Sequence, residues 1–309
     1  WRFAALIAFI LLTACDGAER GEPAPGLDAD PGAGVDELRE GPFKLLLYSH
    51  TNGFRHASIE AGILMVQQLA SANDFSVDAT EDPNAFTAEN LAQYEVVLFL
   101  NTTLDVLNSE QESAFEAYVQ AGGGFAGIHS AADTEHDWPF YGELVGAQFL
   151  AHPVANQPGT LIVEDAEHPS MAHLSNPWNL LLEEFYSFKS NPRGQVRVLA
   201  HIDESSYLLE PNTSCDPSGP TFPQGYAAAM GDHPMTWCHD KFAGRAWYTA
   251  IGHEIYLYGL AEYQAHVLAG ILTVARRMPA NCAVNAAPEG QPAYIEPELE
   301  GCENQVLPF

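Results

Sequence analysis

The strongest constraint on the fold is an alternation of short apolar runs with longer amphipathic segments, which begins abruptly at residue 43. The apolar runs have the length of buried strands, and they occupy residues 43–50, 75–80, 94–101 and 125–129. Helical patterns fill residues 58–72 and 109–121, and Ser109 with Glu112 predicts a capping box in the second helix. This alternation predicts an α/β domain with a mostly parallel sheet and helices on both faces.

The second half of the chain is less regular. Strands are predicted at residues 160–164, 195–202 and 246–251, and a closing amphipathic helix at 263–277. The predicted domain therefore spans residues 43–278, and a Pro-rich tail follows at 279–309. With 47% hydrophobic residues, the chain can bury a sizeable core.

The first 42 residues are typical of an exported and tethered protein. An apolar run at 3–12 follows Arg2, and it is shorter than the ~20 residues that span a bilayer, so it indicates a secretory signal. Leu12-Thr13-Ala14-Cys15 resembles a bacterial lipobox, although an ordinary signal peptide with a chance cysteine is the alternative. We therefore expect a signal peptide at 1–15, lipidation of Cys15 and a disordered linker at 16–42. The protein would be exported and lipid-anchored to a bacterial membrane, in the periplasm or at the cell surface.

The remaining cysteines form an even set, which in an exported chain predicts disulfides. They are Cys215, Cys238, Cys282 and Cys302. Proximity along the chain favours Cys215–Cys238 and Cys282–Cys302, although four cysteines allow three pairings. A thiolate metal site is disfavoured because no pair has CxxC spacing.

The charge balance excludes one class of partner. The formal net charge is -29, from 41 acidic and 12 basic residues. Affinity for phosphate backbones comes from Lys and Arg, so nucleic-acid binding is not expected.

Three of the predicted strands end at or just before a histidine, and the carboxyl ends of parallel strands are where ligand sites lie. These histidines are His50, His129 and His253. Each one alone is more often a structural residue, but three at matching positions predict a site. Gly127-Ile128-His129-Ser130-Ala131 resembles a strand-to-helix elbow with His129 exposed at its tip. An imidazole there can act as general acid or base or as a metal ligand, whereas Ser130 falls one residue past the tip.

Carboxylates and aromatic rings accompany these histidines. Asp133 follows the elbow and is expected to orient His129. Trp138, Tyr141 and Trp237 can stack on a sugar ring, or belong to the core. The Glu183-Glu184 pair lies beside aromatic residues, and it is either part of the site or a solvated strand edge.

Several motifs in order resemble the trehalose-utilisation (ThuA-like) family over about residues 43–277. They are Phe54-Arg55-His56, residues 122–133, Asp137-Trp138-Pro139, His152-Pro153, His168-Pro169, His233-Pro234 and residues 244–253. The resemblance implies a flavodoxin-like fold of the class I glutamine amidotransferase type, with His129 where amidotransferases carry Cys. It also implies a role in disaccharide or keto-sugar use, alongside a partner sugar oxidoreductase. Two departures are Glu183, where the family often has Asp, and Glu254, where it often has Thr.

We therefore predict an enzyme that cleaves or rearranges a disaccharide or keto-glycoside by acid–base chemistry. Proton transfer is assigned to His129, Asp133, His56, Glu184 and His253, and substrate binding to Arg55, Trp138, Tyr141, His152, Trp237 and Arg245. One rival is a metal-dependent sugar hydrolase, with a divalent ion such as Zn²⁺ bound by His50, His56, His129, His152, His253 and Glu184. The other rival is a surface sugar-binding module without turnover.

Overall fold

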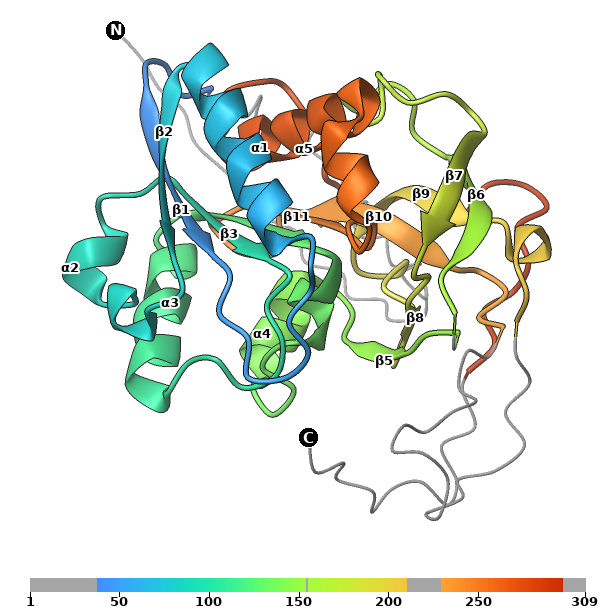
Figure 1. Cartoon of the computed structure of the whole chain (residues 1–309), viewed down its shortest axis with the longest axis horizontal. Coiled ribbons are helices and arrows are strands. Elements are labelled where there is room, and N and C mark those ends of the chain that lie inside the picture. Colours follow the sequence, from blue (N-terminus) through green and yellow to red (C-terminus); the bar gives the residue numbers. More distant parts are fainter. Residues whose placement is uncertain (1–37, 154, 210–228, 297–309) are drawn as a thin grey trace, which may run out of the picture. The chain divides into compact units, whose positions relative to one another are not determined.

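The computed structural model describes residues 38–153, 155–209 and 229–296, and these form a nine-stranded sheet flanked by helices (Figure 1). The strand order is β2-β1-β3-β4-β11-β10-β9-β6-β7, and the first five strands of that order run parallel. These are β2 (Phe75–Thr80), β1 (Phe43–Tyr48), β3 (Val96–Leu100), β4 (Gly124–Ile128) and β11 (Ala246–Thr249). Every residue of β3 and β4 is buried, as expected when helices cover both faces of a parallel sheet.

The other four strands extend the sheet in an antiparallel arrangement. They are β10 (Pro234–His239), β9 (Arg197–Ile202), β6 (Gln157–Val163) and β7 (Trp178–Glu183). A separate two-stranded ribbon pairs β5 (Phe149–Ala151) with β8 (Ser187–Phe188). The chain therefore leaves the far edge of the sheet at β7 and returns to pair β8 with β5 (Figure 1).

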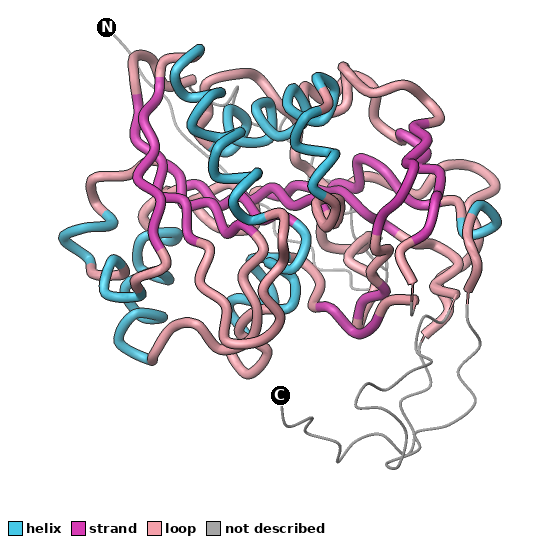
Figure 2. The backbone as a smooth tube through the Cα atoms, in the orientation of Figure 1, coloured by secondary structure: helices cyan, strands magenta, loops and turns pink. Residues whose placement is uncertain are grey.

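Helices cover both faces of the sheet. On one face lie α1 (Ile59–Ala72) and α5 (Ala261–Val274), and on the other lie α3 (Ser109–Gln120) and α4 (Pro139–Val145) (Figures 1 and 2). The short α2 (Ala88–Leu91) packs beside α3. The short 3₁₀ segments are η1 (Pro83–Ala85), η2 (His129–Asp133), η3 (Glu204–Ser206) and η4 (Ile255–Gly259). The predicted flavodoxin-like α/β fold is confirmed, since its parallel strands begin in the order 2-1-3-4.

The start of α3 differs from the prediction by one residue. Asn108 is the N-cap, and its side chain accepts hydrogen bonds from the backbone N–H groups of Glu110 and Gln111. Gln111 completes the capping box by accepting from the Asn108 backbone N–H. The predicted Ser109–Glu112 box is wrong because Asn is as good a cap as Ser, and both spacings fit the motif.

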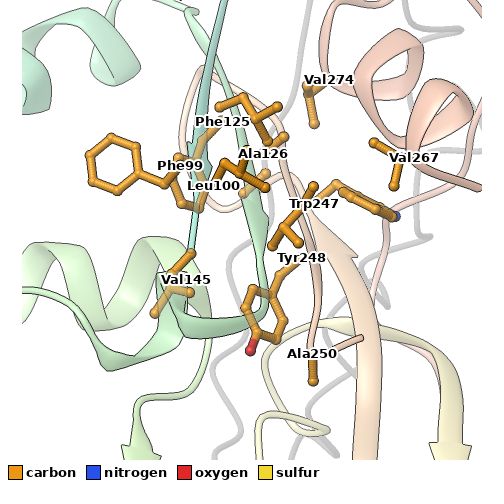
Figure 3. Close-up of a cluster of buried hydrophobic side chains, with 14 of the residues drawn as sticks. Phe99, Leu100, Phe125, Ala126, Val145, Trp247, Tyr248, Ala250, Val267 and Val274 are labelled. Carbon is orange, nitrogen blue, oxygen red and sulfur yellow. The ribbon is translucent and has the colours of Figure 1, made fainter. Parts of the chain in front are cut away.

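The core has two layers, one on each side of β4 and β11 (Figure 3). Trp247 extends toward Val267 and Val274 of α5, whereas its neighbour Tyr248 lies on the opposite side with Val145 of α4. Successive residues of a strand face opposite sides, so one short strand anchors both helical layers. The carboxyl ends of β4 and β11 are thereby held on a rigid support.

The described disulfide joins Cys238 of β10 to Cys282, with 5.3 Å between the Cα atoms. This overturns the pairings Cys215–Cys238 and Cys282–Cys302, while Cys215 and Cys302 themselves lie outside the described residues. Sequence proximity is a poor guide here because the tail packs back on β9, where the side chain of Asn285 bonds both backbone groups of Val198. The tail is therefore fixed to the antiparallel half of the sheet.

The amino-terminal predictions fall mostly outside the described residues. The signal peptide, Cys15 and residues 16–37 of the linker are among these. Contacts with the domain begin before Phe43, because the Arg39 backbone N–H bonds the Arg276 carbonyl and its guanidinium bonds the Gly122 carbonyl. Within the described part of the chain, no helix combines the length and the apolar character needed to cross a membrane.

Candidate functional site

His129 is the first residue after β4, and its backbone has φ +50°. A positive φ at a non-Gly residue costs about 1–3 kcal/mol, which the surrounding contacts must offset. The Tyr248 hydroxyl donates to the His129 carbonyl at 2.7 Å, and the ring Nδ1 lies 2.8 Å from the Ala250 carbonyl. The predicted elbow is present, but the prediction that its side chain is exposed is wrong, because His129 is completely buried.

His253 reaches the same place from the loop after β11. Gly252 precedes it with φ +152°, and a Cβ there would lie 2.6 Å from Ile128. The Gly252 carbonyl accepts hydrogen bonds from the hydroxyls of Ser58 and Tyr258. Glycine is required at this turn, and the turn places His253 Nδ1 3.3 Å from His129 Nε2.

Glu184 completes the group from the far edge of the sheet. Its Oε2 lies 3.3 Å from His129 Nε2 and 3.1 Å from His253 Nδ1, and its Oε1 lies 3.2 Å from His152 Nδ1. The preceding Glu183 accepts hydrogen bonds at Oε1 from the backbone N–H groups of Glu184 and His253, each at 3.0 Å. Both carboxylates are buried, so the alternative of a solvated strand edge is wrong.

Burial and the contacts between Glu184 and the imidazoles shift the pKa values of Glu184 and His253 in opposite directions. Burial alone would raise the pKa of Glu184, but contacts with His129 and His253 hold it well below its usual range. Burial lowers the pKa of His129, and lowers that of His56 to about 2. Burial would also lower the pKa of His253, but its contact with Glu184 outweighs this and raises it. The site thus combines an ionised carboxylate with a basic imidazole.

Two further histidines border this group. His56 is buried, its Nδ1 lies 3.3 Å from the Ser130 hydroxyl, and its ring lies edge-on to those of His129 and His253. His152 is more accessible, with 27% of its side chain exposed, and His253 has 19% exposed. We call His56, His129, His152, Glu184 and His253 the imidazole–carboxylate cluster. Solvent reaches it through His152 and His253.

Asp133 does not orient His129. Its carboxylate lies 2.7 Å from His136 Nε2, and Lys189 approaches the other nitrogen of that ring. The 3₁₀ turn that begins at His129 carries Asp133 away, so the Ala250 carbonyl and Glu184 hold the His129 ring instead. The prediction for Asp133 is therefore wrong.

The predicted substrate-binding residues are mostly engaged elsewhere. Tyr141 and Trp237 are completely buried in the core, where they donate to the carbonyls of Ala131 and Val145. Arg245 precedes β11, at the opposite end of that strand from His253, and pairs with Asp240. Of the predicted substrate-binding set, His152 is the residue that joins the cluster.

The other predicted residues are held by local contacts. Trp138 packs on Phe140 and Tyr141 at the start of α4. Arg55 forms ion pairs with Glu60 and Glu81. His50 hydrogen-bonds the Glu81 carbonyl and the Asn52 side chain, so it is not part of the metal-ligating set proposed from the sequence.

Three residues that shape the site were given no role in the sequence-based prediction. Glu183 ties the end of β7 to His253, and burial raises its pKa to about 8. Tyr186 packs 4.3 Å from the His129 ring, and the 63%-exposed Phe54 packs 4.9 Å from His56. The sequence did offer a signal for Glu183, because it forms an acidic pair with Glu184, but only the structure shows that both side chains are buried.

Four members of the cluster offer donor atoms that could hold a metal ion. One atom each from His56, His129, Glu184 and His253 lies within 4.8 Å of the others. Elsewhere in the described residues, His168 approaches Cys238 and Cys282, but those sulfurs form a disulfide. Glu135 in a third group is occupied by the backbone N–H groups of Val106 and Leu107.

Comparison with known proteins agrees with this architecture. The family model described as trehalose utilisation (ThuA) matches residues 44–273. A ThuA-like protein from Bacteroides uniformis has a similar structure, with TM-score 0.61 and 23% identity over 76% of this chain and 93% of that one. A ThuA-like protein from Parabacteroides merdae gives TM-score 0.59 and 18% identity over 82% of this chain and 95% of that one. No curated protein matches the chain.

Proposed function

Because the chain belongs to the ThuA family of trehalose utilisation, we propose that it is an enzyme that acts on a carbohydrate at the imidazole–carboxylate cluster. The observation that carries the proposal is the convergence of His129, His253 and Glu184 within 3.3 Å of one another. These residues come from three distant parts of the sequence, and one of them has a strained backbone. Strain and buried ionisable groups are concentrated at functional sites more often than elsewhere.

The chemistry we propose is proton transfer to or from a sugar oxygen. Of the two imidazoles that approach Glu184 Oε2, His253 is the accessible one, with 19% of its side chain exposed against none for His129. Its contact with the Glu184 carboxylate fixes its ring and supports a positive charge on it. His129 is a positioning residue, since it is completely buried and acts through Glu184. His152 faces the same carboxylate from the solvent side and is placed to bind the substrate.

The substrate that fits this proposal is a disaccharide or keto-glycoside, which the enzyme cleaves or rearranges. Phe54 supports such a substrate, because its exposed ring beside His56 provides a flat apolar face for the C–H side of a pyranose. We further propose that the protein is exported and anchored to the membrane through Cys15, with the sequence Leu12-Thr13-Ala14-Cys15 as support. A sugar oxidoreductase would supply the oxidised substrate.

Mass spectrometry of products from a panel of oxidised and unoxidised disaccharides tests the proposal. Turnover that falls about 10²–10⁴-fold in His253→Ala and in Glu184→Gln supports it. His136→Ala is the matched control, because this histidine also contacts a carboxylate but lies outside the cluster. Saturable sugar binding without any product would overturn the proposal of an enzyme and favour a sugar-binding module.

A further inference from the structure

Three donor atoms of the cluster form a nearly regular triangle. The separations are 3.3 Å from His129 Nε2 to Glu184 Oε2, 3.1 Å from Glu184 Oε2 to His253 Nδ1, and 3.3 Å from His253 Nδ1 to His129 Nε2. We infer that His129, His253 and Glu184 bind a divalent metal ion of the Zn²⁺ type. This inference rests on the proposed function only in that both place the chemistry at the imidazole–carboxylate cluster.

The hydrogen bond at the far side of the His129 ring fixes which nitrogen faces the triangle. Nδ1 must carry the proton, because its partner, the Ala250 carbonyl, can only accept. A neutral ring then presents a lone pair at Nε2, directed at a carboxylate oxygen and a second imidazole nitrogen. Metal-bound histidines almost always donate their other N–H to a carbonyl or carboxylate in this way.

The distances fit a coordination sphere better than a direct ion pair. Charge-assisted N–H···O bonds are about 2.7–2.9 Å long, which is shorter than all three separations. Tetrahedral Zn²⁺ has Zn–N and Zn–O bonds of about 2.0–2.1 Å, so two ligand atoms lie about 3.3–3.4 Å apart. The triangle therefore has nearly the dimensions of one face of such a tetrahedron.

The surroundings meet the remaining needs of a metal site. Glu183 holds the backbone of both Glu184 and His253, and Tyr248 holds that of His129, so the three ligands are oriented by outer contacts. The buried carboxylate of Glu184 favours a cation at this place. One ring nitrogen of His56 and one donor atom from each of His129, Glu184 and His253 lie within 4.8 Å of one another, so His56 is a neighbour of the three ligands.

A set of three protein ligands with an open position is typical of catalytic rather than structural zinc. A bound ion would offer that position to a water molecule or to a hydroxyl or carbonyl oxygen of the sugar. His253 Nδ1 would then ligate the ion instead of sharing a proton with Glu184. The complete burial of His129, which is unfavourable for a residue that must touch a substrate, is ordinary for a metal ligand.

Metal binding can be measured without any substrate. The full chain is purified without chelators, stripped with EDTA and titrated with ZnCl₂ by calorimetry. We expect one ion per chain, and at least a tenfold loss of affinity in His129→Ala, His253→Ala and Glu184→Gln. His136→Ala and His50→Ala should bind like the wild type, which excludes general attraction to surface histidines and acids. Equal affinity in all five variants, or no stoichiometric binding, overturns the site.

If a ligand variant does not fold, the metal site can still be tested in the wild-type protein by substituting Co²⁺ for Zn²⁺. Co²⁺ in the wild-type protein should show the visible bands of a four-coordinate nitrogen and oxygen site, and an octahedral spectrum would contradict the inference. Turnover that persists in stripped protein unable to bind Zn²⁺ overturns the metal site and leaves the proposed function intact. Zn²⁺ binding without turnover of any sugar overturns the proposed function and leaves the metal site.

Discussion

The parallel and antiparallel halves of the sheet contribute to the cluster in different ways. The parallel half delivers His129 and His253 directly, because β4 and β11 are neighbours and both end at the same edge. The antiparallel half delivers Glu184 indirectly, from β7 at the far end of the sheet order. The chain after β7 runs back and pairs β8 with β5, and this return brings the carboxylate to the imidazoles.

This difference shows that a neighbouring pair of parallel strands defines where a site lies, while a remote element decides its chemistry. Two adjacent imidazoles by themselves repel when both are charged. The carboxylate from the other half removes that repulsion and turns them into a proton-transfer or metal-binding set. The cluster is therefore complete only when both halves are folded and docked.

Removing either contribution should abolish turnover. We expect His129→Ala, from the parallel half, and Glu184→Gln, from the antiparallel half, each to lower kcat/KM about 10²–10⁴-fold. The double variant should be little worse than the single ones, because the two residues act as a unit. Steady-state kinetics on purified variants, with His136→Ala as control, checks this. Additive losses would mean that the halves contribute independently.

The disulfide affects only one half. Replacing Cys238 and Cys282 with Ser should lower the free energy of unfolding by roughly 2–4 kcal/mol, because the link between β10 and the tail is lost. Turnover at 25 °C should be unchanged, since the bond does not contact the cluster. Urea unfolding and kinetics on the same samples test this, and a large fall in kcat would show that the tail positions the site.

Low pH should lower the stability of the parallel half, because His266 of α5 takes up a proton. This ring is completely buried beside Trp247, its nitrogens lie 2.8 Å from the Ser170 carbonyl and 3.1 Å from the Thr249 hydroxyl, and burial lowers its pKa to about 4. Because the folded pKa lies below the unfolded one, this contribution to stability is complete above about pH 6.5. It is lost as the pH falls toward 4, by at most about 3 kcal/mol.

Urea unfolding between pH 7 and 4 measures this loss. The wild type should lose stability over that range more steeply than His266→Gln, whose side chain cannot take up a proton there. Equal slopes for the two proteins would exclude His266 as the source.

Glu183 is the contact that joins the halves, because it bonds the backbone of Glu184 and of His253. Glu183→Ala leaves two buried N–H groups without acceptors and should cost about 1–3 kcal/mol of stability. Glu183→Gln keeps an acceptor oxygen at the same place and should cost much less. Thermal unfolding of the two variants gives the comparison, and equal losses would show that packing rather than the hydrogen bonds matters.

Much of the parallel half could be predicted from sequence. The run at residues 75–80 is the strand observed, and the helix predicted at 58–72 is observed at Ile59–Ala72. The antiparallel half was harder, since β7 and β10 were not predicted and β6 begins three residues before the predicted 160. Strands that are exposed on one face, such as β7, carry a weaker apolar signal than strands that are buried on both.

The amino-acid sequence by itself determined the α/β class, the turn at His129 and the family, because periodicity, glycine placement and motif order are local properties. Only the tertiary structure decided which side chains meet: Glu184 rather than Asp133 at His129, Cys282 rather than Cys215 at Cys238, and core positions for Tyr141 and Trp237. The physical reason is that contacts between residues distant in sequence depend on the order of the strands in the sheet and on the path of the chain between them. These are set by the packing of the whole sheet and leave no signal in any single segment.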